Sequence, residues 1–176
     1  MYMRYIISSL HPSDMYNAYI LAVDGDVSFL PADVIRLAQA LQTKREVGAI
    51  CGRIYPTGSG LVLWFQAVEY AISHWLYKST EALVGNVLCC PGCFTMYRAS
   101  ALNSNDLLTS YASNTKNAID HLMQDQGEDR WLTTLVLKSG YQTSYAQMHG
   151  LIPCARFPSP SYKSSNSRRW YPLDNV

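Results

Sequence analysis

The stretch Tyr19-Ile-Leu-Ala-Val-Asp-Gly-Asp26 decides the fold class of this chain. Its first five residues form an apolar run of the length that is typical of a buried parallel strand. Pro31 follows where a helix can begin, and apolar residues recur after it at helical spacing as far as Leu41. A short strand, a polar turn and an amphipathic helix in succession indicate an α/β fold.

Strands and helices continue to alternate on the carboxyl-terminal side of this stretch. We predict strands at 47–55, 93–97 and 141–146, helices at 61–83 and 128–139, and loops at 56–60 and 103–117. The first of these helices has one apolar side, and Gly140 is a natural stop for the second. In an α/β sheet, ligands collect at the carboxyl ends of the strands, which is where Asp24 and Asp26 fall.

The composition excludes several classes of protein. Apolar residues make up 48% of the 176 residues, which is typical of a globular chain rather than a disordered one. The net charge of +1 gives no field that would attract nucleic acid or an anionic membrane surface. No apolar run reaches the roughly 20 residues that cross a bilayer. The odd count of 5 Cys argues against a disulfide framework, so the sequence alone reads as soluble and intracellular.

Asp24 and Asp26 form the first candidate site. Two carboxylates that flank a glycine at the end of a strand can both approach one hard cation. Mg²⁺ or Mn²⁺ held there would neutralise the diphosphate of a nucleotide and stabilise it as a leaving group. The alternative is a polar turn in which Asp caps the following helix, and an isolated Asp-x-Asp motif favours that alternative.

Glu128, Asp129 and Arg130 form the second candidate site. Acidic residues that open a helix are favoured by its dipole, and this capping role explains the tetrapeptide from Gly127 without any chemistry. The chemical interpretation makes one carboxylate a general base that deprotonates an attacking hydroxyl, with Arg130 as its anchor.

Two further clusters carry little information when each is taken alone. The segment Cys89-Cys-Pro-Gly-Cys93 contains a Cys-x-x-Cys spacing, but zinc needs a second ligand pair and a redox motif needs a thioredoxin-like context. Packing cysteines around a tight Pro-Gly turn are the favoured interpretation. Arg168, Arg169 and Trp170 form a basic, aromatic patch, in which Arg can pair with phosphate and Trp can stack on a sugar ring.

Taken together and in order, these motifs resemble the chitin synthases, especially the animal-like type. The resemblance covers about residues 1–145, and the stretch Asp125-Gln-Gly-Glu-Asp-Arg-Trp-Leu132 is nearly diagnostic. The other similar segments are Tyr19 to Phe29, Val47 to Ile54, Gly58-Ser-Gly60, Trp64 to Leu76 and Leu88-Cys-Cys-Pro-Gly-Cys-Phe-Thr-Met-Tyr-Arg98. The family implies a GT-A fold, which is a Rossmann-like mixed sheet flanked by helices.

The resemblance also implies a reaction and a role for each candidate residue. The donor would be UDP-N-acetylglucosamine, and the product a β-1,4-linked chitin chain made with inversion at the anomeric carbon. Asp24 and Asp26 would bind the divalent cation and the diphosphate, and Arg168-Arg169-Trp170 would bind the donor or the product. Asp129 would activate the 4-hydroxyl of the growing chain, with support from Glu128 and Arg130. Pro91-Gly92-Cys93 would lie beside the acceptor sugar.

The family pattern implies parts that this sequence lacks. Its first nucleotide-binding strands would precede Met1, so we expect a domain truncated at the N-terminus and without the transmembrane helices. We expect residues 1–146 to be a partial catalytic domain and residues 147–176 a divergent tail. In that tail, Asn166 to Trp170 is a degenerate form of the family's Gln-x-x-Arg-Trp motif. Our hypothesis for the divergence is a reading frame shifted by one base over 147–153, from a frameshift or a mispredicted splice junction.

The resemblance also predicts a location and a set of partners. The parent protein would lie in the plasma membrane, with its catalytic domain facing the cytoplasm and with membrane segments that are missing from this chain. Its partners would be UDP-N-acetylglucosamine and the chitin chain, without nucleic acid, and homo-oligomers are compatible with this picture.

Two other functions stay open at this point. Another processive β-glycosyltransferase, such as a relative of the cellulose or hyaluronan synthases, would share the Asp-x-Asp motif and the acidic base. Glu128-Asp129-Arg130 and the segment from Pro91 to Phe94 favour chitin over these relatives. A non-catalytic fragment is the other function, and we predict that the 176-residue chain alone has no synthase activity because half of the donor site is missing.

Overall fold

The computed structural model describes residues 2–57, 60–112, 127–146 and 154–158. The elements are, in chain order, α1 (Tyr2–Ser8), β1 (Tyr19–Val23), α2 (Pro31–Thr43), β2 (Val47–Cys51), β3 (Arg53–Thr57), α3 (Leu61–Ala71), the π-helical segment η1 (Ile72–Tyr77), α4 (Lys78–Val84), β4 (Phe94–Arg98), α5 (Ala99–Leu102), the 3₁₀ segment η2 (Ser104–Asp106), α6 (Leu107–Tyr111), α8 (Glu128–Lys138), β5 (Gln142–Tyr145) and β6 (Cys154–Pro158). Among the described helices, none combines the length and the apolar character that crossing a membrane requires.

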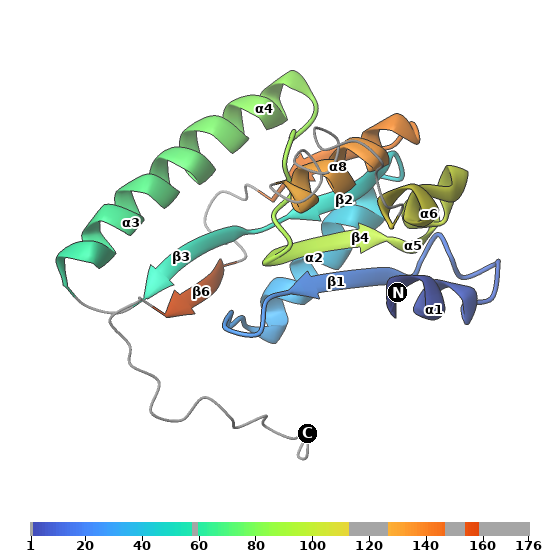
Figure 1. Cartoon of the computed structure of the whole chain (residues 1–176), viewed down its shortest axis with the longest axis horizontal. Coiled ribbons are helices and arrows are strands. Elements are labelled where there is room, and N and C mark those ends of the chain that lie inside the picture. The colour runs from blue at the N-terminus through green and yellow to red at the C-terminus, as the bar shows by residue number, and fades with distance from the viewer. Residues whose placement is uncertain (1, 58–59, 113–126, 147–153, 159–176) are drawn as a thin grey trace, which may run out of the picture.

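A mixed sheet of four strands forms the centre of the molecule, in the order β1-β4-β2-β5 (Figure 1). β4 runs antiparallel to both β1 and β2, whereas β2 and β5 are parallel. β3 and β6 form a separate two-stranded parallel ladder. The predicted mixed α/β sheet flanked by helices is therefore confirmed.

The prediction that β1 is a buried parallel strand is wrong. Tyr19–Val23 pairs antiparallel with β4, and all five residues are only partly buried. In the described part of the chain, β4 is its one partner, so β1 lies at the edge of the sheet. An apolar run of five residues does not specify the direction of the neighbouring strand, and this explains the error.

Most of the other predicted elements lie close to their predicted positions. α2, β4, α8 and β5 match the predicted ranges, and Gly140 ends α8 with a φ of 86°. The predicted strand at 47–55 is divided into β2 and β3 around Gly52. The predicted loop at 103–117 contains η2 and α6 in its described part. α1, α5 and β6 were not predicted.

The two faces of the sheet pack into two apolar clusters. Tyr97 of β4 lies in a cluster with residues of α1, α6 and α8. Its neighbours Phe94 and Met96 lie in the other cluster, with Leu37 and Leu41 of α2. The alternation along β4 follows the two-residue period of a strand, so α8 and α2 cover opposite faces.

Arg98, at the end of β4, fastens the sheet to its surroundings. The side chain is 2% exposed and donates hydrogen bonds to the carbonyl oxygens of Tyr16, Leu41, Lys44 and Val47. A buried guanidinium needs such acceptors, because its donors would otherwise lose water without compensation.

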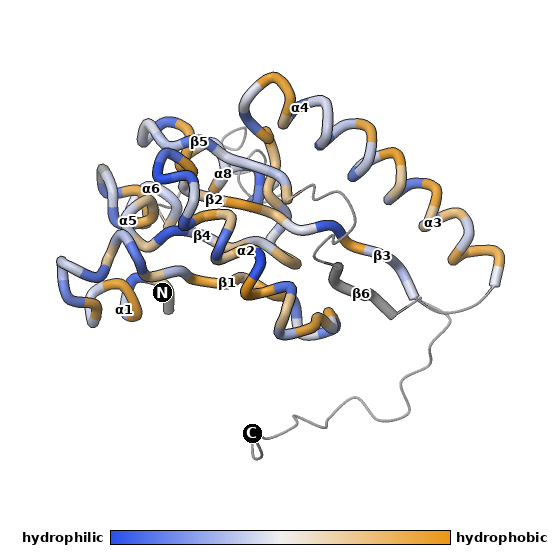
Figure 2. The backbone as a smooth tube through the Cα atoms, turned by 180° about the vertical axis from the view of Figure 1, so that it is seen from behind, coloured by the Kyte–Doolittle hydropathy of each residue, from blue (hydrophilic) through white to orange (hydrophobic). Residues whose placement is uncertain are grey.

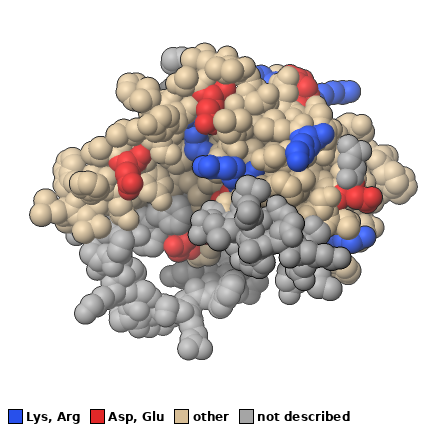
Figure 3. Space-filling model, turned by 45° about the horizontal axis from the view of Figure 1, so that its top comes forward, with Lys and Arg blue, Asp and Glu red and all other residues tan. Residues whose placement is uncertain are grey.

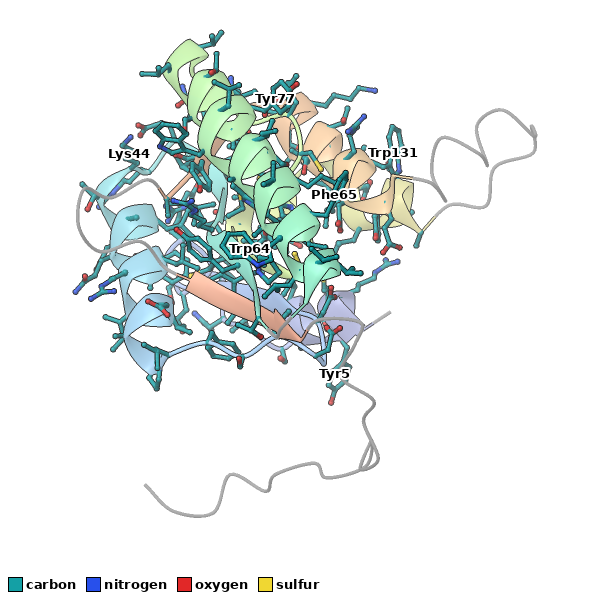
Figure 4. All side chains as sticks on the ribbon, turned by 90° about the vertical axis from the view of Figure 1, so that its left-hand side faces the viewer. Tyr5, Lys44, Trp64, Phe65, Tyr77 and Trp131 are labelled. Carbon is teal, nitrogen blue, oxygen red and sulfur yellow. The ribbon has the colours of Figure 1, made fainter. Side chains whose placement is uncertain are left out.

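A continuous helical stretch of α3, η1 and α4 runs along the outside of the molecule (Figures 1 and 4). The apolar side predicted from the sequence faces solvent, since Leu61 is 89% exposed, Phe65 78% and Trp64 72%. The exposed row continues through Val68, Ile72, Trp75 and Leu76. Figure 2 shows hydrophobic (orange) bands alternating with paler and hydrophilic (blue) ones along α3 and α4.

Candidate active site

Two segments that carry candidate residues meet at one end of the sheet. Asp24 follows the last residue of β1, and Cys93 precedes the first residue of β4. The antiparallel register pairs Val23 with Phe94, so the Asp24–Asp26 turn and the Pro91–Cys93 segment leave the sheet at the same edge. The turn is closed by a hydrogen bond from the amide of Val27 to the carbonyl oxygen of Asp24 at 3.1 Å.

The amino end of α8 brings Asp129 to the same edge. A Cβ atom added to Gly92 would lie 2.7 Å from Oδ1 of Asp129, so the carboxylate packs directly against the glycine backbone. Gly92 leaves the space that this carboxylate occupies. The structure thus brings together Asp24, Asp129 and Gly92, which the sequence places more than 30 residues from one another.

The pKa values of Asp24 and Cys93 reflect the closeness of these side chains to Asp129. Partial desolvation of the exposed Asp24 carboxyl raises its pKa, and the neighbouring charges of Asp26 and Asp129 raise it further. Burial also raises the pKa of the Cys93 thiol to about 12, with Asp24 and Asp129 contributing. Cys93 is therefore a neutral thiol at neutral pH, and its role here is packing rather than nucleophilic attack.

Asp24 and Asp26 fit the binding of a divalent cation that also has phosphate ligands. Mutual repulsion of carboxylates is relieved by a cation, and Mg²⁺ is commonly held by one or two carboxylates together with substrate phosphates. Both side chains are exposed and can therefore be reached from solvent. Within the described ranges, no cluster of three or more His, Cys, Asp or Glu is placed to hold a metal by itself.

Glu128 and Arg130 lie on α8 on either side of Asp129, and both are exposed. No ion pair joins Arg130 to Asp129, because successive residues of a helix point in different directions. Glu128 lies near Tyr111 of α6, whose pKa is raised by burial and then by Glu128 and Asp129. The anchoring role of Arg130 stays a prediction.

The backbone before β4 is held by side chains from three directions. Lys78 of α4 donates to the carbonyl oxygen of Cys89 at 2.6 Å. The amide of Cys90 donates to the Thr133 hydroxyl of α8 at 2.9 Å. The Thr95 hydroxyl donates to the carbonyl oxygen of Pro91 at 2.5 Å. The segment that carries Gly92 is therefore fixed at three successive residues.

The cysteines agree with the packing interpretation. Cys51, Cys89, Cys90 and Cys93 are free thiols, and Cys51 and Cys90 are fully buried. A hydrogen bond with Cys51 and burial raise the pKa of Cys90. The same hydrogen bond lowers the pKa of Cys51. A buried thiol that keeps its proton, as Cys90 does, is a poor metal ligand and a poor redox group.

Other predicted and unpredicted residues complete the description. Arg168, Arg169 and Trp170 lie outside the described residues. Sequence reasoning missed Thr133, and it also missed Tyr70 of α3, whose pKa is raised by burial and by Cys93, Glu69 and Asp26. A polar residue at the inward position of an otherwise apolar helix face was the available signal for Thr133.

Charge elsewhere on the surface is mixed. On the face shown in Figure 3, Lys and Arg side chains lie among Asp and Glu side chains. This distribution agrees with the net charge of +1.

The comparisons with known proteins agree on one family. The chitin synthase family model matches residues 3–170. A chitin synthase of Meloidogyne artiellia is 44% identical over 157 residues, which make up 89% of this chain and 8% of that protein. The Caenorhabditis elegans chitin synthases chs-1 and chs-2 are each 46% identical, over 74% and 73% of this chain and 10% and 8% of their own lengths. The chain thus spans about a tenth or less of these relatives, and it belongs to the chitin synthase family.

Proposed function

We propose that this chain is part of the catalytic domain of a larger chitin synthase. That enzyme transfers N-acetylglucosamine from UDP-N-acetylglucosamine to the 4-hydroxyl of a growing β-1,4 chitin chain. The observation that carries the proposal is the meeting of the Asp24 turn, the Gly92 segment and Asp129 at one edge of the sheet. Family membership supports the reaction class.

Asp129 is the general base in this proposal. Its carboxylate takes the proton of the acceptor 4-hydroxyl while the hydroxyl oxygen bonds to the anomeric carbon. The bond from that carbon to the UDP oxygen breaks on the opposite side, so the configuration inverts. An acceptor sugar beside Pro91-Gly92-Cys93 would lie next to Asp129, because this carboxylate packs against Gly92.

Asp24 and Asp26 are the residues that would hold Mg²⁺ or Mn²⁺ beside the donor diphosphate. When bound, the ion supplies positive charge that stabilises the departing diphosphate. Glu128 and Arg130 support the base, and Arg168, Arg169 and Trp170 bind the donor or the product. The larger protein lies in the plasma membrane, with this domain facing the cytoplasm, and homo-oligomers are part of the proposal.

The test is Asp129→Asn in the larger synthase. Loss of a general base lowers turnover by about 10²- to 10⁴-fold and leaves donor binding nearly unchanged. Turnover is measured with radiolabelled UDP-N-acetylglucosamine, and donor affinity by calorimetry. Asp14→Asn, an exposed carboxylate outside the site, is the control. A loss of donor affinity as large as the loss of turnover would contradict the role of the base.

The identity of the sugar needs a separate experiment. UDP-glucose is added as a competitor to UDP-N-acetylglucosamine, and incorporation of each labelled sugar is counted. We expect N-acetylglucosamine to dominate the polymer. Preferential incorporation of glucose would instead favour a cellulose synthase-like activity.

A further inference from the structure

We infer that Thr133 is a positioning residue. It holds the Cys89–Cys93 segment, proposed to lie beside the acceptor sugar, at a fixed distance from Asp129. The inference rests on the proposed function, because it assigns Asp129 the role of base. Thr133 lies on α8 one helical turn after Asp129 and is fully buried. None of the predicted catalytic or binding roles includes it.

The hydroxyl of Thr133 joins the two parts of the site through one oxygen atom. It donates to the carbonyl oxygen of Asp129 at 2.7 Å and accepts from the amide of Cys90 at 2.9 Å. A hydroxyl can donate once and accept at the same time, so both bonds form together. The base residue and the Cys90 backbone are therefore linked by two consecutive hydrogen bonds.

The link matters because the packing that it controls is tight. Gly92 is two residues from Cys90, and a Cβ added to it would lie 2.7 Å from Asp129 Oδ1. A general base acts within hydrogen-bond reach of the proton that it removes, and a misplacement of about 1 Å can cost about 100-fold in rate. A shift of Cys90 relative to α8 would move Gly92 against the carboxylate.

Thr133 is the described side chain that ties this segment to α8. Lys78 ties Cys89 to α4, and Thr95 ties Pro91 within the β4 region. Neither of these bonds relates the segment to the helix that carries the base. Removal of the Thr133 hydroxyl would thus leave the segment attached, but with its distance to Asp129 unspecified.

Thr134 supplies a matched control on the same helix. Its hydroxyl donates to the carbonyl oxygen of Arg130 at 2.8 Å, the same four-residue bond that Thr133 makes to Asp129. Thr134 is less buried, and no hydrogen bond joins its side chain to the Cys89–Cys93 segment. Thr→Val at the two positions removes the same group, but only the change at 133 removes the link.

The first readout is hydrogen exchange of the Cys90 amide in the full chain. We expect Thr133→Val to speed this exchange at least tenfold, because the amide loses its acceptor. Thr133→Ser keeps the hydroxyl and is expected to restore slow exchange, and Thr134→Val is expected to leave the rate within about twofold of the parent. Circular dichroism spectra of the variants confirm that each is folded.

The second readout is turnover in the larger synthase. We expect Thr133→Val to lower kcat about tenfold or more with an unchanged KM for the donor. We expect Thr133→Ser and Thr134→Val to stay within about twofold of the parent. Asp129→Asn is measured in parallel. If it abolishes turnover while Thr133→Val does not lower kcat, the positioning role is overturned and the proposed function stands.

The remaining outcomes are also decisive. Unchanged Cys90 exchange in Thr133→Val would overturn the inference at the level of structure. Equal losses of kcat in Thr133→Val and Thr134→Val would assign the effect to α8 as a whole and would also overturn it. Full turnover in Asp129→Asn would contradict the proposed function, whereas the exchange result would still report whether Thr133 holds the segment.

Discussion

At the residue scale, an alanine Cβ at position 48 or 92 would make an equally close contact, but the two substitutions have different consequences. A Cβ on Gly48 would lie 2.7 Å from Cβ of Tyr141 and 2.8 Å from Cβ of Ala101, atoms that cannot move without their backbones. A Cβ on Gly92 would meet the Asp129 carboxylate, which can rotate away. Neither glycine has a positive φ, so the backbone accepts alanine at both positions.

We therefore predict that Gly48→Ala destabilises the fold by about 1–3 kcal/mol, because the clash forces backbone shifts. Gly92→Ala is expected to cost less than about 1 kcal/mol in stability and to lower kcat of the larger synthase at least tenfold. Urea denaturation and turnover assays measure the two effects. A stable Gly92→Ala variant with full turnover would show that the contact with Asp129 has no role in catalysis.

A second residue-scale prediction concerns His74, on the inward side of the long helix formed by α3, η1 and α4. The ring is 4% exposed and stacks on Tyr70 with centroids 5.7 Å apart. Burial lowers its pKa to about 4, with smaller contributions from Lys78 and Arg53. The unfolded chain binds a proton at His74 below about pH 6.5, whereas the folded chain does so only near pH 4.

Stability contributed by neutral His74 is thus complete above about pH 6.5 and is lost as the pH falls towards 4. We expect the loss to be roughly 2 to 3 kcal/mol, and His74→Phe should remove this part of the pH dependence. Urea denaturation of the parent and of His74→Phe at pH 7.5 and pH 4.5 isolates the contribution of His74, because the carboxylates contribute to both proteins. Identical pH dependence in the two proteins would show that His74 is not held neutral by burial.

At the element scale, the exposed row of the long helix predicts the behaviour of the chain in solution. Large contiguous apolar surfaces are uncommon on soluble monomers and drive association. We expect the isolated chain to self-associate at micromolar concentrations. Trp64→Ser, Phe65→Ser and Trp75→Ser together should reduce the mass measured by light scattering after gel filtration towards that of a monomer.

A control of equal size separates this helix from exposed apolar groups in general. Tyr5, Tyr16 and Ile35 are 75%, 60% and 57% exposed and lie outside the long helix. Serine at these three positions should leave self-association unchanged. A similar reduction in both triple variants would mean that the association depends on scattered apolar groups rather than on the helix.

The same helix illustrates what the sequence could predict at this scale. The spacing from Leu61 to Leu76 identified the helix and its apolar side, since both are local properties. It did not reveal that this side faces solvent, because the face that a helix buries depends on its neighbours. Tyr70, His74 and Lys78 instead face inward, although two of them are polar or charged.

At the scale of the whole molecule, the sequence predicted the elements better than their pairing. β4 and α8 were placed correctly because composition and spacing within each segment specify them. The break at Gly52, the direction of β1 and the pairing of β3 with β6 depend on contacts between distant residues. The family pattern predicted Asp24, Gly92 and Asp129 as parts of one site, whereas Thr133 could be found only from its two hydrogen bonds.

The central position of β4 has a consequence for synthesis on the ribosome. β1 and β2 do not pair with each other, and each pairs with β4, which lies more than 40 residues after β2 in the sequence. A ribosome that has released residues only as far as α4 therefore exposes both strands with their β4-facing edges unpaired. Such edges are prone to aggregation, so a translational pause before Arg98 would be hazardous for this protein. The Asp24 turn cannot take its final place until Phe94 has left the exit tunnel.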